Sequence, residues 1–156
     1  MVCPHCGNED QIVTNTRSTS KNTKNWRRRK CTKCFKIFTT YEAPDLRYVR
    51  VIKKDGSRVV YKREKIYASV FSAFIKTKNS DSGESASQAN KVVSDFEYII
   101  LRNNLKEIKT RDITILLYTL LKKYEYSVAI NYVSYYLRPS SFGALKNIED
   151  KESKLL

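Results

Sequence analysis

The sequence predicts an α+β fold in two parts, a small cysteine-rich module and then a domain with a β-hairpin and about four helices. Three observations predict it. All four cysteines stand in the first quarter of the chain, as two C-x-x-C pairs. Two short β-patterned segments around an Asp-Gly turn signal open the second part, and apolar residues then recur at helical spacing. With 41% hydrophobic residues, the 156-residue chain has enough apolar material for a packed core.

The cysteine spacing predicts a metal site. Cys3 and Cys6 form one C-x-x-C turn, and after a spacer of 24 residues Cys31 and Cys34 form the second. Two such turns close a tetrahedral Cys₄ site of the kind that zinc prefers, within a zinc ribbon over residues 1–42. Four protein ligands leave no open position, so we expect one structural Zn²⁺ per chain. Unligated thiols, iron in place of zinc, and His5 in place of one cysteine are the alternatives.

A basic run leads into the second cysteine pair. Between Arg17 and Lys36 there are nine basic residues and no acidic residue. Guanidinium groups bind phosphate in a bidentate way and also read guanine edges, whereas a solvated charged face is the alternative interpretation. The predicted DNA-binding residues are Arg17, Lys24, Arg27, Arg28, Arg29 and Lys30. Trp26 stacks on a base or sugar, or covers the small core of the ribbon.

Residues 43–48 read as a linker because Pro44 interrupts local structure. The second domain is expected at 49–139. It opens with strands at 48–53 and 58–61, joined by Asp55-Gly56 in a type I′ turn. Residues 140–156 are expected to form a mobile C-terminal tail.

Four helices are expected after the hairpin, with residues 78–87 as a loop between the first two. Thr110 is expected to cap the third helix, and Pro139 to end the fourth. The apolar faces of the four helices, in chain order, are as follows: Ile66, Val70, Phe74 and Ile75; Ala89, Val92, Val93, Phe96, Ile99 and Ile100; Ile113, Leu116, Leu117, Leu120 and Leu121; Val128, Tyr132, Val133 and Tyr136.

Charge and missing motifs narrow the function. Thirty Lys and Arg residues against 16 acidic residues give a net charge of +14, which favours a polyanionic partner. The longest apolar stretch, residues 113–121, is too short for a membrane span, and the N-terminus lacks the pattern of a secretion signal. We therefore expect a cytoplasmic protein with reduced cysteines and no membrane partner. His5 is the single histidine, and nucleophile, Walker A and metalloprotease motifs are missing, which favours binding over catalysis.

These pieces together resemble a known family. The order and spacing of the matching segments make the match specific. It extends from residue 1 to about residue 140. The segments are Cys3-Pro4-x-Cys6, Thr16-Arg17-Ser18, Arg27-Arg28-Arg29-Lys30-x-Cys31-x-x-Cys34 and Phe38-Thr39-Thr40-Tyr41-Glu42. In these segments the chain resembles the bacterial NrdR family, transcriptional repressors of ribonucleotide reductase genes, which carry a zinc ribbon and an ATP-cone domain.

The second part resembles an ATP-cone. The matching segments are Val51-Ile52-Lys53-Lys54-Asp55-Gly56, Tyr61, Arg63-Glu64-Lys65-Ile66 and Ile108-Lys109-Thr110-x-Asp112-Ile113. The resemblance implies that ATP or dATP binds at Val51, Lys53, Lys54, Lys65 and Thr110. The chain departs from the family pattern at Val59, Lys62, Asn131 and Leu137.

The expected function is a nucleotide-responsive repressor rather than an enzyme. The resemblance implies binding of double-stranded operator DNA by the ribbon, a homo-oligomer whose state depends on ATP or dATP, and a nucleoid-associated bacterial location. One alternative is an RNA-binding zinc-ribbon protein associated with the ribosome or RNA polymerase. A second is an enzyme in which a regulatory cone is attached to a catalytic metal site.

Overall fold

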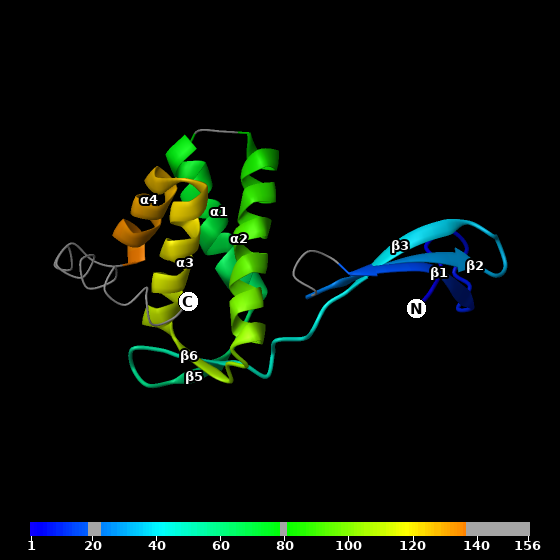
Figure 1. The fold of residues 1–156 in the computed structure, drawn as a ribbon, viewed down its shortest axis with the longest axis horizontal. Coiled ribbons are helices and arrows are strands. Elements are labelled where there is room, and N and C mark those ends of the chain that lie inside the picture. Colours follow the sequence, from blue (N-terminus) through cyan, green and yellow to red (C-terminus); the bar gives the residue numbers. More distant parts are fainter. Residues whose placement is uncertain (19–22, 79–80, 137–156) are drawn as a thin grey trace. The chain divides into compact units, whose positions relative to one another are not determined.

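The computed structural model describes residues 1–18, 23–78 and 81–136, and the chain divides between Asp45 and Leu46 into two compact units (Figure 1). The α+β class is confirmed: one unit is a small β-sheet module, and the other combines a second sheet with four helices. The predicted tail, the helix end at Pro139, and residues Lys21 and Leu137 lie outside the described residues.

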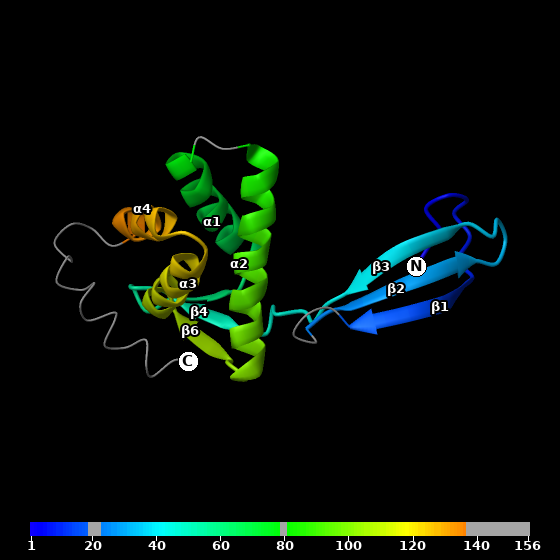
Figure 2. The ribbon, with the colours of Figure 1, turned by 45° about the horizontal axis from the view of Figure 1, so that its top comes forward.

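The first unit is a three-stranded antiparallel sheet in the order β1-β2-β3 (Figure 2). Its strands are β1 (Gln11–Ser18), β2 (Asn25–Cys31) and β3 (Ile37–Glu42). A bulge between Val13 and Asn15 shifts the register of β1 against β2. The central strand, β2, ends at Cys31, so the turn that carries Cys31 and Cys34 follows directly from the sheet.

The second unit holds a smaller sheet in the order β5-β4-β6. Its strands are β4 (Arg50–Ile52), β5 (Arg58–Val60) and β6 (Glu107–Lys109). β4 pairs with β5 in antiparallel and with β6 in parallel direction, and Figure 2 labels β4 next to β6. β4 and β5 are shorter than the two predicted strands. β6 was not predicted, because three residues are too few to show an alternation of polar and apolar side chains, and because β6 pairs with β4, which is far away in sequence.

The turn between β4 and β5 corrects the type I′ prediction. Gly56 has a φ of +81°, but Asp55 is not among the described residues with positive φ, and a type I′ turn needs both. The Lys53 amide donates to the Ser57 carbonyl at 2.9 Å, and the Gly56 amide donates to the Lys53 carbonyl at 3.1 Å. This pattern is a three-residue hairpin loop, a type I turn followed by a glycine in the left-handed region.

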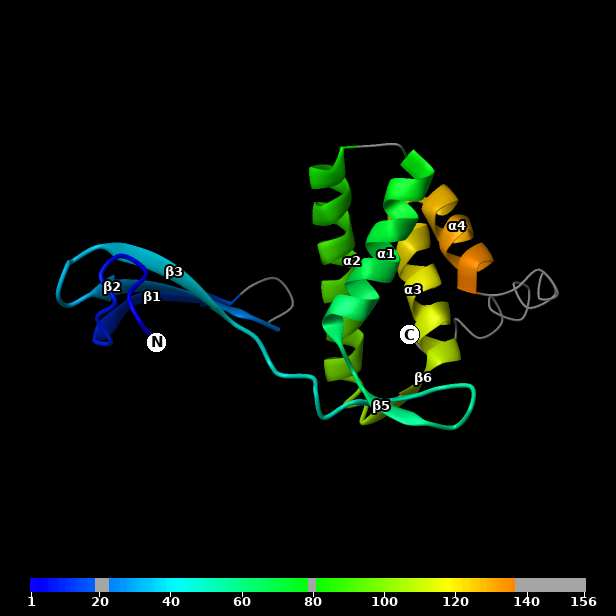
Figure 3. The same cartoon turned by 180° about the vertical axis from the view of Figure 1, so that it is seen from behind.

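The four predicted helices are confirmed, and they pack on one another beside the small sheet (Figures 1 and 3). α1 lies against α2 and α4, and α3 lies against α4 and α2. Their bounds are α1 Arg63–Lys78, α2 Ser82–Arg102, α3 Thr110–Tyr124 and α4 Tyr126–Tyr136. Within the described part of the chain, none of these helices is both long and apolar enough to cross a membrane.

Two helix starts differ from expectation. Residues 82–87 belong to α2 instead of a loop, with Asp81 at the N-cap position and Glu84 in the first turn. An acid or hydroxyl residue followed three positions later by glutamate is a helix-start signal, here hidden in a Ser- and Gly-rich segment. Thr110 is not the cap of α3 but its first residue, and Lys109 occupies the cap position.

The helical faces meet in one core. The predicted faces are buried, except that Ile66, Ile75 and Ile99 are half-buried and Tyr136 remains 38% exposed. Leu46, in the expected linker, and Val49 also join this core. Its members with no exposed surface at all include Val49, Val70, Phe74, Ala89, Val92, Val93, Phe96, Ile100, Leu117, Leu121, Val128 and Ala129.

Candidate metal centre and ligand cavity

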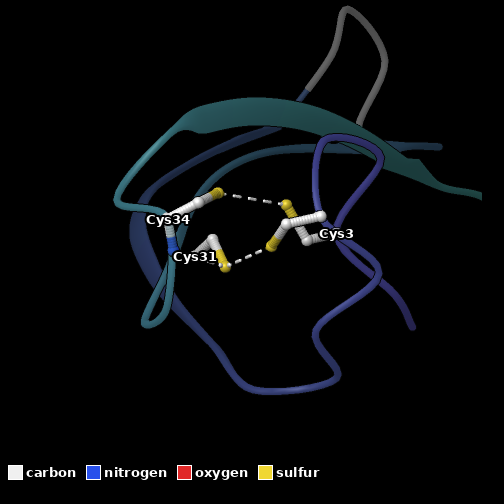
Figure 4. Close-up of side chains that lie close together, drawn as sticks. Cys3, Cys31 and Cys34 are labelled. Atoms are coloured by element: carbon white, nitrogen blue, oxygen red, sulfur yellow. Dashed lines mark hydrogen bonds between the residues drawn. The ribbon is translucent and has the colours of Figure 1, made fainter.

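The four cysteine sulfur atoms converge at one point, all within 4.8 Å of one another. The Sγ atoms of Cys3 and Cys34 are 3.7 Å apart, and those of Cys6 and Cys31 are 3.6 Å apart (Figure 4). A zinc ion with Zn–S bonds of about 2.3 Å at the centre of a tetrahedron requires sulfur–sulfur edges of about 3.8 Å. These two edges match that value and the remaining sulfur pairs lie within 4.8 Å, so the cluster suits a four-thiolate ion, and the grouped ligands do not include His5.

Backbone geometry forms the first cysteine turn. The Gly7 amide donates to the Cys3 carbonyl at 2.9 Å, and Gly7 has a φ of +71°, a value that glycine adopts without strain. The Cys3 amide in turn donates to the Asn8 carbonyl at 2.8 Å. These bonds hold Cys3, which is 2% exposed, in place toward the other sulfurs.

The second turn supplies donors to sulfur. The amides of Lys33 and Cys34 lie 3.4 and 3.5 Å from Cys31 Sγ, and the Asn8 side-chain amide lies at 3.8 Å. The Cys34 amide, followed by that of Lys33, outweighs burial and lowers the pKa of Cys31 to about 6. Such donors stabilise a thiolate, which is the form that binds a metal.

The six predicted DNA-binding residues all stand on the sheet beside this centre or next to it. Arg17 is on β1, Lys24 directly precedes β2, and the other four form most of β2. Arg17 and Arg28 are exposed, and the remaining four are half-buried. Trp26 is half-buried, with the Arg17 guanidinium carbon 5.9 Å from its ring centre, so it is neither fully in a core nor fully free.

In the second unit, a cavity of about 620 Å³ opens between the hairpin and the helices. All five residues predicted for nucleotide binding line it, although they come from four separate segments: β4, the hairpin turn, the start of α1 and the start of α3. The lining residues are Val51, Lys53, Lys54, Asp55, Val59, Val60, Tyr61, Lys62, Lys65, Ile66, Ser69, Thr110, Ile113, Thr114, Tyr132 and Tyr136.

The wall of the cavity combines amines with apolar side chains. Lys53, Lys54 and Lys65 are exposed at its margin and give point positive charges of the kind that neutralise phosphates. The Thr110 hydroxyl donates to the Ile52 carbonyl at 3.1 Å and so ties the start of α3 to β4. The N-cap residue of α3, Lys109, makes no side-chain cap hydrogen bond, which leaves amides of the first turn available to a ligand beside Thr110.

Asp55 adds a carboxylate to the same wall. It accepts hydrogen bonds from the Ser57 hydroxyl at 2.6 Å and the Ser57 amide at 2.9 Å. These bonds hold the pKa of Asp55 below its usual value. The ionised carboxylate therefore fastens the turn that carries Lys53 and Lys54.

The sequence interpretation missed a buried polar group behind the cavity. The Tyr61 hydroxyl donates to Glu97 Oε1 at 3.3 Å, and Arg63 Nε lies 3.4 Å from the same oxygen. Burial, followed by the charge of Glu97, raises the pKa of Tyr61, so the phenol keeps its proton. The sequence signal for this group is Glu97, an acidic residue four positions after Val93 on the otherwise apolar face of α2. The group pins the junction of β5 and α1 to α2.

Two tyrosines of α4, Tyr132 and Tyr136, also line the cavity, and Tyr132 is at the same time a member of the core, as its spacing predicts. Val59 and Lys62, which depart from the family pattern, are lining residues too. Asn131 is not one of the residues that line this cavity. Its side-chain amide donates to the Thr77 hydroxyl at 2.8 Å and links α4 to α1.

Comparison with known proteins adds independent findings. Residues 1–42 match the family model described as the N-terminal domain of transcriptional repressor NrdR-like proteins, and residues 49–138 match the ATP cone domain. A transcriptional repressor NrdR of a Polaromonas species is 32% identical over 151 residues, 97% of this chain and 98% of its own. Transcriptional repressor NrdR of Caldicellulosiruptor bescii is 37% identical over 136 residues, 87% of this chain and 86% of its own.

One matched region falls in each of the two units, and residues 43–48 and 139–156 lie outside the matches. The relatives are transcriptional repressors and not enzymes. Four clustered cysteines in the ribbon and a basic, partly apolar cavity in the cone fit that architecture. The chain belongs to the NrdR family of transcriptional repressors, with an N-terminal zinc ribbon and an ATP-cone domain.

Proposed function

We propose that this chain is a nucleotide-responsive repressor that binds operator DNA of ribonucleotide reductase genes through its zinc ribbon. One structural Zn²⁺ per chain is held by Cys3, Cys6, Cys31 and Cys34. ATP or dATP in the cone controls a homo-oligomeric state and thereby DNA binding. The protein works in the bacterial cytoplasm, associated with the nucleoid.

One observation carries the proposal: each unit brings together the chemistry for one of two polyanions. The cysteine cluster anchors the end of β2, whose sequence is Asn-Trp-Arg-Arg-Arg-Lys-Cys. A metal at that end would make the basic strand rigid, and rigid cations lose less entropy on binding than a loose tail does. Because bound cations release counterions from a duplex, affinity should fall steeply with salt.

The cavity of the cone supports the second ligand. Its volume of about 620 Å³ lies in the range of small-molecule sites. Three lysines at the margin suit a triphosphate, while Val51, Val59 and Ile113 offer apolar surface to a base. The amides at the start of α3 would add donors to phosphate oxygens.

Regulation follows if the nucleotide and the DNA each favour the same assembly. By reciprocity, a nucleotide that raises DNA affinity by some factor has its own affinity raised by DNA by the same factor. ATP and dATP differ by one hydroxyl, which a hydrogen-bonding site distinguishes. Paired ribbons in a symmetric oligomer would then engage paired half-sites.

The test is DNA binding by the zinc-loaded full chain, followed by fluorescence anisotropy. Labelled duplexes carry the ribonucleotide reductase promoters of the same genome, and a scrambled duplex of equal length is the control. Binding is measured with ATP, with dATP and without nucleotide, and the size of each complex is determined in parallel. We expect promoter affinity to exceed scrambled affinity at least tenfold in one nucleotide state, together with a different oligomer.

Other outcomes overturn parts of the proposal. Equal affinity and equal size in the three nucleotide conditions would reject nucleotide control. Preference for a structured RNA over the promoter duplex at fixed salt would favour an RNA-binding zinc ribbon instead. Retention of nucleotide affinity in a Lys53→Ala, Lys65→Ala variant would move the nucleotide away from this cavity.

A further inference from the structure

The basic strand β2 presents its side chains to two different environments. Successive residues of a strand point to opposite faces, and directly paired residues share a face. Arg27 is paired with Thr16 and Thr40, whereas Arg28 is paired with Asn15 and Thr39. The three consecutive arginines are therefore divided, with Arg27 and Arg29 on one face and Arg28 on the other.

On the first face, both arginines bind one carboxylate. Arg27 Nε lies 3.0 Å from Glu42 Oε2, and Arg29 Nη2 lies 3.1 Å from Glu42 Oε1. Arg29 Nε also donates to the Thr40 hydroxyl at 3.0 Å. The Arg29 side chain is only 15% exposed. We call Arg27, Arg29, Thr40 and Glu42 the clamped face.

The opposite face has cations and aromatic rings, and the strand positions described on it include no carboxylate. Its strand positions pair Arg17 with Trp26, and Trp26 with Tyr41. Arg17 lies over the Trp26 ring, and Tyr41 is 68% exposed. We call the following residues the open face: Arg17, Trp26, Arg28, Lys30 and Tyr41.

Arg28 is central to the open face and exposed. It is the middle residue of the register row Asn15, Arg28 and Thr39, and Lys30 follows in the next row, between Ile12 and Ile37. Ile12 is 55% and Ile37 47% exposed. At the strand positions that the structure describes on this face, every charged residue is a cation.

We infer that duplex DNA docks on the open face through Arg17, Arg28 and Lys30, and that Arg27 and Arg29 hold the sheet together instead of binding DNA. This inference rests on the proposed DNA-binding function and divides its candidate residues. Charge complementarity selects the open face, since no acidic residue shares the described strand positions with its three cations, while two cations share one carboxylate on the clamped face. A phosphate that binds Arg29 would have to compete with the contacts of this side chain to Glu42 and Thr40.

The aromatic residues fit the same partner. Trp26 holds the Arg17 guanidinium against its ring, which limits the directions that this cation can take. The exposed ring of Tyr41 offers a hydroxyl and an apolar surface to the sugar–phosphate backbone. A three-stranded antiparallel sheet is narrow enough to place the face against a groove, as other β-sheet readers do.

The experiment compares neighbouring arginines in the full zinc-loaded chain with its operator duplex. Arg28→Ala is the test variant, and Arg27→Ala is its matched control one residue away. For each variant, operator affinity is measured at salt concentrations from about 50 to about 300 mM, where affinity changes steeply with salt. Zinc content and Trp26 fluorescence are measured in parallel. We expect Arg28→Ala to lose about tenfold in affinity and about 0.9 of log–log salt slope per bound ribbon, with zinc retained.

Arg27→Ala should keep the salt slope and the operator affinity within about twofold, while its ribbon unfolds at lower denaturant concentration. Glu42→Gln provides a second variant, because it releases both arginines without removing either. Its ribbon should also be less stable, but the salt slope of its DNA binding should stay that of the unmodified chain. Should Arg27→Ala fold too poorly, Glu42→Gln at saturating zinc still decides between the faces, because a salt slope larger by about 0.9 or more would show that a released arginine binds phosphate and would overturn the division.

The opposite pattern overturns the division. If Arg27→Ala, with zinc and fluorescence intact, loses affinity and slope as Arg28→Ala does, both faces bind DNA. If Arg28→Ala is unchanged while Arg27→Ala is weakened, the faces are reversed. Failure of the unmodified chain to bind any duplex would instead reject the proposed function itself, which keeps the two failures distinguishable.

Discussion

The ribbon and the cone obtain their stability from different sources. Among the described residues up to Asp45, the buried hydrophobic residues are Cys3 and Cys31, both ligands of the cysteine cluster. Every member of the large buried apolar cluster lies between Leu46 and Val133. We therefore expect the ribbon to depend on a bound ion for the energy that the cone obtains from hydrophobic burial. One chain would then contain a metal-dependent unit and a metal-independent unit, and each could be perturbed by itself.

The largest effect should come from metal removal. Chelation of zinc, or Cys31→Ser, should unfold residues 1–45, because structural zinc contributes about 10–16 kcal/mol in small sites of this kind. Trp26 is the single tryptophan and lies in the ribbon, so its fluorescence reports on this unit alone. We expect a red shift of that fluorescence, whereas the thermal transition of the helices, followed by circular dichroism, stays in place.

Thr32→Ser is a suitable control, since a serine hydroxyl can keep the hydrogen bond to the Asp10 carbonyl beside the same cysteine turn. It should retain zinc and an unshifted fluorescence spectrum. A ribbon that keeps its native spectrum in Cys31→Ser with full zinc content would contradict the four-ligand centre.

The reverse perturbation is a cavity in the cone. Phe96 is fully buried on α2, so Phe96→Ala should destabilise the cone by about 3–5 kcal/mol. Denaturant unfolding followed by circular dichroism measures the loss. Zinc affinity and Trp26 fluorescence should not change, and a lowered zinc affinity would show that the two units are not energetically independent.

A smaller effect is expected at the buried polar group of the cone. Glu97→Ala leaves the Tyr61 hydroxyl without that acceptor and Arg63 without that carboxylate, which should cost about 2 kcal/mol. Because this group pins the β5–α1 junction beside the cavity, nucleotide affinity should fall as well, measured by calorimetric titration. Tyr61→Phe, which keeps the Arg63–Glu97 pair, should lose less in both measurements. Equal nucleotide affinity in all three proteins would restrict the group to a purely structural role.

The same comparison explains how far the sequence could predict this molecule. Cysteine spacing located the metal centre because coordination geometry acts between residues that are close in sequence within each turn. Helical periodicity located all four helices of the cone, since Leu117 or Phe96 must face the core whatever the neighbouring elements are. Periodic burial and ligand geometry are thus properties that local sequence records.

Properties set by distant partners were harder to predict. β6 exists because Ile108 is paired with Val51, and nothing within residues 107–109 records that pairing. The division of Arg27 from Arg28 depends on the register of β2 against β3, and on Glu42 at the far end of the partner strand. The Asp-Gly signal predicted a hairpin correctly, but its turn type depends on whether one or two residues adopt positive φ.

The smallest expected effect allows the most direct comparison of the two units, because the same type of backbone strain can be introduced into each of them. Gly7 in the ribbon and Gly56 in the cone both have positive φ, +71° and +81°, and a Cβ at either position would meet no atom within 4 Å. Alanine at each site therefore adds backbone strain of about 1 kcal/mol and no steric clash.

The two units should report this equal strain in different ways. In Gly7→Ala it weakens the folded ribbon against the metal-free chain, so zinc affinity should fall about fivefold while the cone melts as before. In Gly56→Ala it lowers the free energy of unfolding of the cone by about 1 kcal/mol and leaves zinc affinity unchanged. Gly83→Ala is the control: Gly83 lies in the first turn of α2 without positive φ, and its Cβ would meet only the movable end of Asp81 at 3.0 Å. Since alanine favours a helix over glycine, this variant should be neutral or slightly stabilising. A loss of cone stability in Gly7→Ala as large as that in Gly56→Ala would mean that the ribbon also supports the fold of the cone, and the two sources of stability would then have to be treated as one.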